Sequence, residues 1–119
     1  MQSYQDLIVW QRGVELVAEV YRLTRKFPKE EMFGLISQMR RAAVSIPANI
    51  AEGFARKHRA EYVQFLRVAF GSGAELETHL ILAEKLQFVS RVEVSKTAGL
   101  LNETMRMLNK LLSSLVAKP

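Results

Sequence analysis

The sequence predicts an all-α protein, a left-handed up-down-up-down four-helix bundle, and three observations support this. Apolar residues recur at intervals of three and four along almost the whole chain, as they do on the buried side of amphipathic helices. The 119 residues include only 6 glycines and 3 prolines, which leaves few places for a helix to end. The expected connections are short, which favours antiparallel neighbours. We expect one domain over residues 1–119, with helices near 5–27, 30–53, 59–88 and 91–116.

The first helix carries two adjacent apolar stripes. One runs from Leu7 to Thr24 and the other from Val9 to Phe27. Together they cover about half of the circumference, which is more than one neighbour requires. We expect this helix to be buried on two sides, by helices of the bundle or by another subunit. Pro28 then ends it, because helix is disfavoured at the residue before a proline.

The second helix has to pass Pro47. Its apolar stripe keeps its phase on both sides of the proline, which indicates a kinked helix and not a break. Proline has no amide hydrogen, so the carbonyl of Ala43 loses its usual donor, and Ser45 or Asn49 is placed to help satisfy the freed backbone. Gly53 is predicted to cap the helix at its C-terminus.

The third helix has to cross the segment AFGSGAE, residues 69–75. The apolar stripe from Tyr62 to Ala83 continues through this segment in register, so we expect one long helix whose small residues let a neighbour approach closely. Such packing has to offset about 1 kcal/mol of helix propensity for each glycine. Ser90 and Glu93 form a predicted capping box at the start of the fourth helix.

Two segments give the chain a resemblance to a known family. They are SIPANIAEG at residues 45–53, with Ser45, Pro47, Asn49, Glu52 and Gly53, and FLRVAFGSGAELETHL at residues 65–80. Together they closely resemble the four-helix-bundle proteins encoded in intervening sequences of bacterial 23S ribosomal RNA genes. The resemblance extends from about Tyr4 to the fourth helix. It implies a left-handed bundle, but no established activity comes with it.

The same family also resembles the accessory variability proteins of diversity-generating retroelements. Those proteins are homopentameric, basic and barrel-shaped, and they work with a reverse transcriptase and nucleic acid. The resemblance therefore implies a homo-oligomer, a ring of five copies, and contact with RNA or DNA.

Positive charge is concentrated in one third of the chain. The net charge is +5, and residues 22–59 hold 9 cations and 3 anions, whereas the remainder holds 8 cations and 9 anions. Such an uneven excess favours an anionic partner, although a solvated face without a partner is the alternative. The candidate nucleic-acid-binding residues are Arg22, Arg25, Lys26, Lys29, Arg41, Arg56, Lys57 and Arg59.

Most of these cations fall at two corners, which lie at opposite ends of the second helix if the hairpins are antiparallel. A ring of five would multiply each corner into a basic collar that is suited to phosphates along a strand. Aromatic residues are sparse there, with only Phe54 in the second cluster, which argues against sequence-specific base recognition.

Glu77 and Glu84 are predicted to point toward the centre of the third helix's apolar arc. A lone carboxylate there would be costly, so each requires a partner. Arg40 is the first partner expected for Glu77, and Asn49 is the second. We interpret the arrangement as a structural ion pair, within or between subunits, and not as an acid–base pair, because no nucleophile or electrophile accompanies it.

No catalytic group, metal site or cofactor is predicted. The chain has no cysteine and only two histidines, and a stable metal site needs three or four ligands. His79 lies four residues after Glu75, which predicts a surface hydrogen bond between them. The motifs of phosphate loops, serine hydrolases and zinc proteases are absent.

The sequence shows no signal peptide and no apolar run of 18 residues, so we expect a cytoplasmic protein without membrane contact. The function that we expect is a non-enzymatic, homo-oligomeric module that binds RNA or DNA through phosphate contacts. The alternative is a protein-interaction scaffold that docks a partner protein, with the cations serving solubility or protein contacts.

Overall fold

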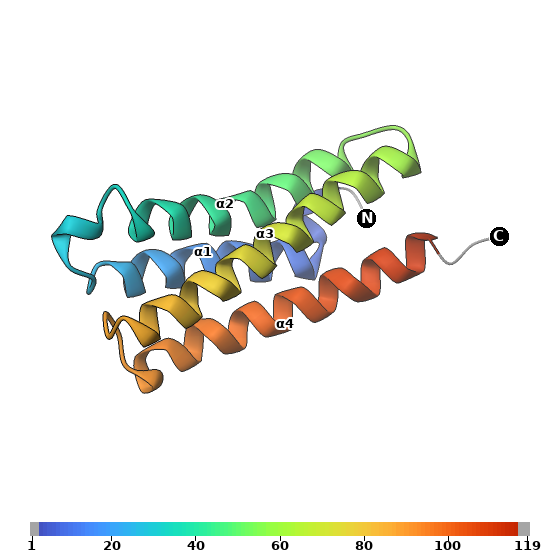
Figure 1. Ribbon diagram of the computed structural model, residues 1–119. Helices are drawn as coiled ribbons and strands as arrows, with labels where there is room; N and C mark the ends of the chain where they lie inside the picture. Colours follow the sequence, from blue (N-terminus) through green and yellow to red (C-terminus); the bar gives the residue numbers. More distant parts are fainter. Residues whose placement is uncertain (1–2, 117–119) are drawn as a thin grey trace.

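The computed structural model describes residues 3–116, which form four long helices that alternate in direction (Figure 1). They are α1 (Ile8–Thr24), α2 (Leu35–Phe54), α3 (Arg59–Lys85) and α4 (Arg91–Val116). Two short 3-10 helices, η1 (Tyr4–Asp6) and η2 (Lys29–Glu31), precede α1 and α2. The predicted all-α four-helix bundle is thus confirmed.

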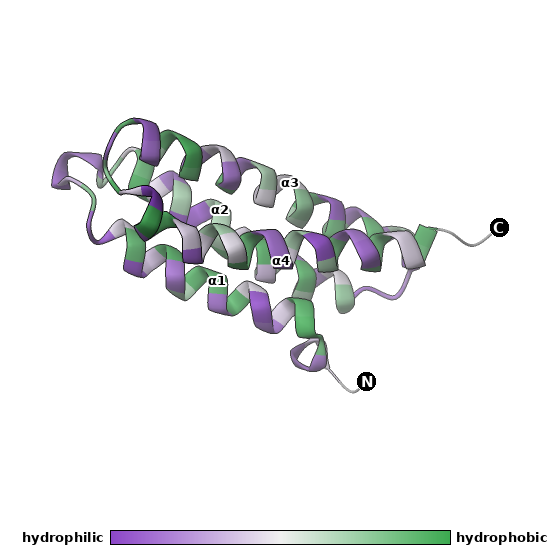
Figure 2. Ribbon diagram, turned by 90° about the horizontal axis from the view of Figure 1, so that it is seen from below, coloured by the Kyte–Doolittle hydropathy of each residue, from purple (hydrophilic) through white to green (hydrophobic). Residues whose placement is uncertain are grey.

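The four helices enclose a single apolar core. α1 and α3 each pack against both α2 and α4, and the α2–α3 contact is the most extensive. The helices alternate between apolar and polar residues along their length (Figure 2), as expected when one side faces the core. The core includes the fully buried side chains of Leu16, Met39, Ile46, Leu66 and Leu108. Each helix therefore contributes to burying the others.

The α2 helix continues through Pro47, as its apolar phase predicts. Pro47 is buried against α1, where Gly13 makes room for it: a Cβ atom at Gly13 would lie 3.4 Å from the Cβ of Pro47. The proline ring therefore packs against a neighbour that has no side chain of its own.

Ser45 and Asn49 form a small polar network beside this proline. The Nδ2 of Asn49 donates to the carbonyl of Ser45 at 2.8 Å and to its hydroxyl at 2.9 Å. The hydroxyl of Ser72 on α3 donates to the Ser45 hydroxyl at 2.8 Å. Within residues 3–116, no side chain donates to the carbonyl of Ala43, so the network ties α2 to α3 and does not satisfy that carbonyl.

The α3 helix also runs unbroken through Gly71 and Gly73. Gly73 is buried, and a Cβ atom there would overlap the sulfur of Met105 on α4. Gly71 is exposed, and a Cβ atom there would have no neighbour within 4 Å. The prediction of close approach is therefore right for Gly73, whereas Gly71 makes no such contact.

Four helix ends differ from the prediction by three residues or more. The first helix spans Ile8–Thr24 and not 5–27, so it ends before the residue that precedes Pro28. The second helix begins at Leu35 and not at residue 30, because the chain reverses direction through η2 and the turn at 32–34. The backbone amide of Leu35 donates to the Glu31 carboxylate at 3.4 Å, which satisfies one of the free amides at the start of the helix. The third helix ends at Lys85 and not at residue 88, since Gln87 has a φ of 65° and turns the chain toward α4.

The predicted role of Gly53 as a C-terminal cap is wrong. Gly53 lies within the last turn of α2, and no described glycine has a positive φ. A Cβ atom at Gly53 would lie 2.8 Å from the Cβ of Phe65 and 3.2 Å from the carbonyl oxygen of Tyr62. This position therefore requires glycine because α2 and α3 approach closely there.

The capping box at the start of α4 is present as predicted. The backbone amide of Glu93 donates to the Ser90 hydroxyl at 3.1 Å, and the amide of Ser90 donates to the Glu93 carboxylate at 2.8 Å. The backbone hydrogen bond from Ser90 lowers the pKa of Glu93, and the nearby charge of Lys26 lowers it further. The carboxylate therefore stays ionised where the helix needs an acceptor.

Candidate nucleic-acid interface

The structure separates the candidate cations into two groups at opposite ends of the bundle and one residue between them. Arg22, Arg25, Lys26 and Lys29 lie at or near the connection between α1 and α2. Arg56, Lys57 and Arg59 lie at the connection between α2 and α3, at the other end (Figure 1). Arg41 lies between the two groups, on the exposed side of α2.

Three of these eight cations are neutralised by carboxylates of the same chain. Arg22 pairs with Glu19, and its hydrogen bond lowers the pKa of that carboxyl. The other two pairs join Lys26 Nζ to Glu93 Oε2 at 3.4 Å and Arg56 Nη2 to Glu52 Oε2 at 2.9 Å. The Arg56 guanidinium also lies 4.7 Å from the ring centroid of Phe65.

The other five candidate cations are exposed and make no ion pair or hydrogen bond with the side chains of residues 3–116. They are Arg25, Lys29, Arg41, Lys57 and Arg59. A cation without an internal partner gives up no ion pair when it binds a phosphate, so these five are the best placed of the set.

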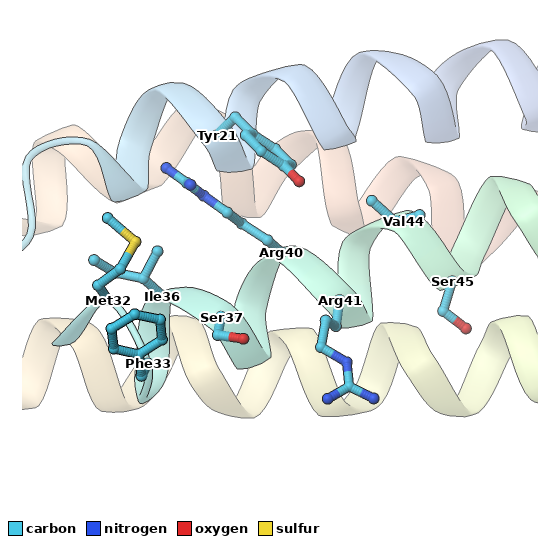
Figure 3. Close-up of a pocket in the computed structure, with 9 residues that line it drawn as sticks. All are labelled: Tyr21, Met32, Phe33, Ile36, Ser37, Arg40, Arg41, Val44 and Ser45. Atoms are coloured by element: carbon cyan, nitrogen blue, oxygen red, sulfur yellow. The ribbon is translucent and has the colours of Figure 1, made fainter.

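The adjacent residues Arg40 and Arg41 point in opposite directions (Figure 3). The Nε of Arg40 donates to the Thr24 hydroxyl at 3.0 Å, and its guanidinium lies 4.4 Å from the ring centroid of Tyr21. Both partners are on α1, so Arg40 holds α1 against α2. The predicted pairing of Arg40 with Glu77 is therefore wrong.

Glu77 and Glu84 lie beside a groove of about 340 Å³ between α3 and α4 and are not buried. Glu77 is exposed, and Glu84 accepts a hydrogen bond from the Nε of Arg91 at 3.0 Å. The apolar arc of α3 is wider than the part that the bundle buries, since Ile81 is 52% exposed. The centre of that arc therefore faces the surface, and an unpaired carboxylate there costs little.

The Nε2 of His79 lies 3.2 Å from the Glu75 carboxylate, which confirms the predicted hydrogen bond. The bond is not at the surface, because His79 is only 8% exposed and its Nδ1 has no hydrogen-bond partner in the described chain. In residues 3–116, no three side chains of the metal-binding types lie close enough together to hold an ion.

An apolar groove between α1 and α2 was not predicted as a site. Two adjoining hollows, of about 670 and 580 Å³, share Tyr21 and Val44. The larger one is lined by residues of α1, including Trp10 and Val17 of the Leu7–Thr24 stripe, and by residues of α2, including Pro47. The two apolar stripes of α1 could have indicated this groove. The bundle covers the stripe from Val9 to Phe27 more fully than the stripe from Leu7 to Thr24, which leaves apolar side chains at the surface.

A family model for the 23S rRNA-intervening sequence protein matches residues 5–110, which is most of the chain. The chain belongs to this family. No curated protein matches it. Among solved structures, it is similar to a crystal structure of a protein of unknown function from the S23 ribosomal protein family of Bacteroides thetaiotaomicron VPI-5482. The match has a TM-score of 0.83 and 22% identity, and it covers 89% of this chain and 96% of the other, so it shows a shared fold.

In this chain, the two segments that resemble the family, residues 45–53 and 65–80, face one another across α2 and α3. Ser45, Asn49 and Ser72 form the network that joins them, and Gly53 permits their close approach. The contact between α2 and α3 therefore explains the residues that these two segments have in common with the family. No helix in residues 3–116 is long and apolar enough to cross a membrane.

Proposed function

We propose that this protein is a non-enzymatic, homo-oligomeric module that binds RNA or DNA through phosphate contacts. The observation that supports this most strongly is the set of five cations without an internal partner: Arg25, Lys29, Arg41, Lys57 and Arg59. They lie near both ends of α2, with Arg41 between the two groups. Exposed cations of this kind can bind phosphates without reading base sequence.

The assembly that we propose is a ring of five copies, as the resemblance to the accessory variability proteins implies. The uncovered α1–α2 groove supports association, because Val14 and Val44 remain 42% and 43% exposed beside Trp10 and Val17. An apolar surface of this kind gains free energy when another protein surface covers it. In a ring, each basic end would be repeated around the axis.

The phosphate-binding proposal predicts a steep dependence of affinity on salt. Binding of labelled single-stranded RNA, followed by fluorescence anisotropy, should weaken with a slope of about −0.7 per phosphate in a plot of log K against log salt. Replacing Arg25, Arg41, Lys57 and Arg59 by glutamine should reduce that slope by about 3, since about four phosphate contacts are lost.

A matched control removes the same charge from α4, which holds none of the candidates. It replaces Arg91, Lys96, Arg106 and Lys110, all exposed, by glutamine. The ion pairs of Arg91 with Glu84 and of Lys96 with Glu19 lie at exposed cations, so their loss should affect the fold little. Equal weakening by both variants, salt-independent binding, or no binding at low salt would contradict the proposal.

The assembly proposal predicts that light scattering will give a mass five times the 13.6 kDa of one chain. Val14→Asp and Val44→Asp together should dissociate the assembly, because each places a charge in the α1–α2 groove. Circular dichroism should show the same helix content, since both side chains lie outside the buried core of a single copy. A wild-type mass of 13.6 kDa would refute the ring.

The α1–α2 groove also favours a second candidate function, a scaffold that docks a partner protein. In that case the cations at the groove's edge, Arg22 and Arg25, would serve protein contacts or solubility. Co-purification from the native host distinguishes the two functions. A partner protein that remains bound after nuclease treatment supports the scaffold, and bound RNA or DNA supports the first proposal.

A further inference from the structure

Phe33 is almost entirely exposed to solvent. This residue lies in the turn between η2 and α2. Its side chain is 97% exposed, the highest exposed fraction among the large apolar side chains of residues 3–116. Its ring contacts no other aromatic ring of the described chain. A phenyl ring in water contributes nothing to the packing of the bundle, so folding of one copy does not explain this residue.

Polar side chains continue from Phe33 along one side of α2. Ser37, Arg41 and Ser45 follow at four-residue intervals, which places them about 6 Å apart along the helix. Figure 3 shows these side chains and Phe33 on the side of α2 that faces away from Tyr21. Phe33, Ser37 and Arg41 also line one hollow of about 580 Å³.

The polar groups beside Phe33 are available for a ligand. Arg41 is exposed and forms no ion pair or hydrogen bond in the described chain, and the same holds for Lys29 in η2. The Ser37 hydroxyl also has no hydrogen-bond partner among residues 3–116, whereas Ser45 is occupied by Asn49 and Ser72. The surface therefore combines an open aromatic ring, a free hydroxyl and free cations.

This combination fits single-stranded nucleic acid. Bases of a single strand can stack on an aromatic side chain while cations hold the phosphates, and a base inside a duplex cannot reach such a ring. An apolar protein surface would cover the ring together with Met32 and Ile36, which line the same hollow, but it would leave the charge of Arg41 without a partner. Val14 and Val17 line the adjoining, larger hollow of the α1–α2 groove.

We propose that Phe33 stacks on a base of single-stranded RNA or DNA while Arg41 binds a phosphate of the same strand. The inference rests on the proposed function and adds a base contact to its phosphate contacts. It gives the protein a preference for single strands over duplexes with little dependence on base identity, because every base has a face that can stack.

The experiment separates the stacking contact from the charge contact. Phe33→Leu keeps an apolar side chain and removes the ring, and it should weaken binding of a 12-nucleotide oligouridine by about five- to 150-fold with an unchanged salt slope. Arg41→Gln should weaken binding and reduce the slope by about 0.7. The same titrations with a 12-nucleotide oligothymidine show whether DNA binds in the same way.

A spectroscopic readout tests the stacking directly. The chain has a single tryptophan, Trp10, so Phe33→Trp adds one indole at the proposed site. Oligouridine should quench the added fluorescence in this variant, whereas wild type should change little. A 12-base-pair duplex of oligouridine with oligoadenosine should quench it much less, because its bases are already stacked.

Each outcome supports or overturns the inference. If wild type binds RNA with a steep salt slope and Phe33→Leu binds equally well without quenching of the added indole, the stacking contact is refuted and the proposed function stands. If wild type binds no RNA at low salt, both fail. If Phe33→Leu changes the mass measured by light scattering without RNA, the ring serves a contact between copies and the inference is overturned.

Discussion

Gly53→Ala is expected to lower the free energy of unfolding by up to about 2 kcal/mol, although alanine is the better helix former. The added Cβ would lie 2.8 Å from the Cβ of Phe65 and 3.2 Å from the backbone carbonyl of Tyr62, so α2 and α3 would have to separate. Overpacking of this kind costs about 1–3 kcal/mol, and the gain in helix propensity of about 1 kcal/mol offsets only part of it. Urea denaturation followed by circular dichroism measures the difference.

The same substitution at Gly71 is the matched control. Gly71 is also within a helix, but a Cβ atom there would meet nothing within 4 Å. Gly71→Ala should therefore raise the free energy of unfolding by about 0.4–1 kcal/mol. Both variants have to be compared at one protein concentration, because the stability of an oligomer depends on it. A stabilising effect at Gly53 would show that the α2–α3 packing is looser than described.

Arg40→Ala is expected to destabilise the bundle by about 1–3 kcal/mol. The substitution removes the hydrogen bond from Nε to the Thr24 hydroxyl and the contact of the guanidinium with the Tyr21 ring. A hydrogen bond from a charged group contributes about 1.5–3 kcal/mol and a cation–π contact about 0.5–2 kcal/mol, although the two are not additive. The measurement is again urea denaturation, together with the RNA affinity of the folded variant.

Arg41→Ala at the next position should give the opposite result. Arg41 has no partner in the described chain, so its loss should change the free energy of unfolding by less than about 0.5 kcal/mol. It should nevertheless weaken RNA binding and reduce its salt dependence. If Arg40→Ala were neutral for stability and Arg41→Ala were destabilising, the assignment of the two arginines would be reversed.

The course of the helices was predictable because local pattern and global packing agree along most of this chain. The apolar phase on both sides of Pro47 and of the Gly71–Gly73 segment was sufficient to predict unbroken helices. Ser90 and Glu93 likewise act within one turn, so their spacing alone identifies the capping box. The predicted helix bounds were wrong at helix ends. The turn between α1 and α2, for example, takes up residues that the apolar pattern alone assigns to a helix.

The candidate site was only partly predictable. The concentration of cations between residues 22 and 59 is visible in the sequence, but their partners are not. Lys26 is paired by Glu93, 67 positions away, and such a contact depends on which helices are neighbours. Phe33 was missed because it was assigned to a regular helix, where one aromatic residue among apolar neighbours is unremarkable.

The sequence by itself therefore determined the number of helices, their continuity and the basic character of the region around α2. These properties depend on periodicity and composition, which can be read from residues that are close together in the sequence. Only the tertiary structure decided that Arg40 serves packing while Arg41 is free, that Gly53 is a contact and not a cap, and that one apolar stripe of α1 is covered less fully than the other. Each of these depends on the distance between residues on different helices, and helical period carries no information about that distance.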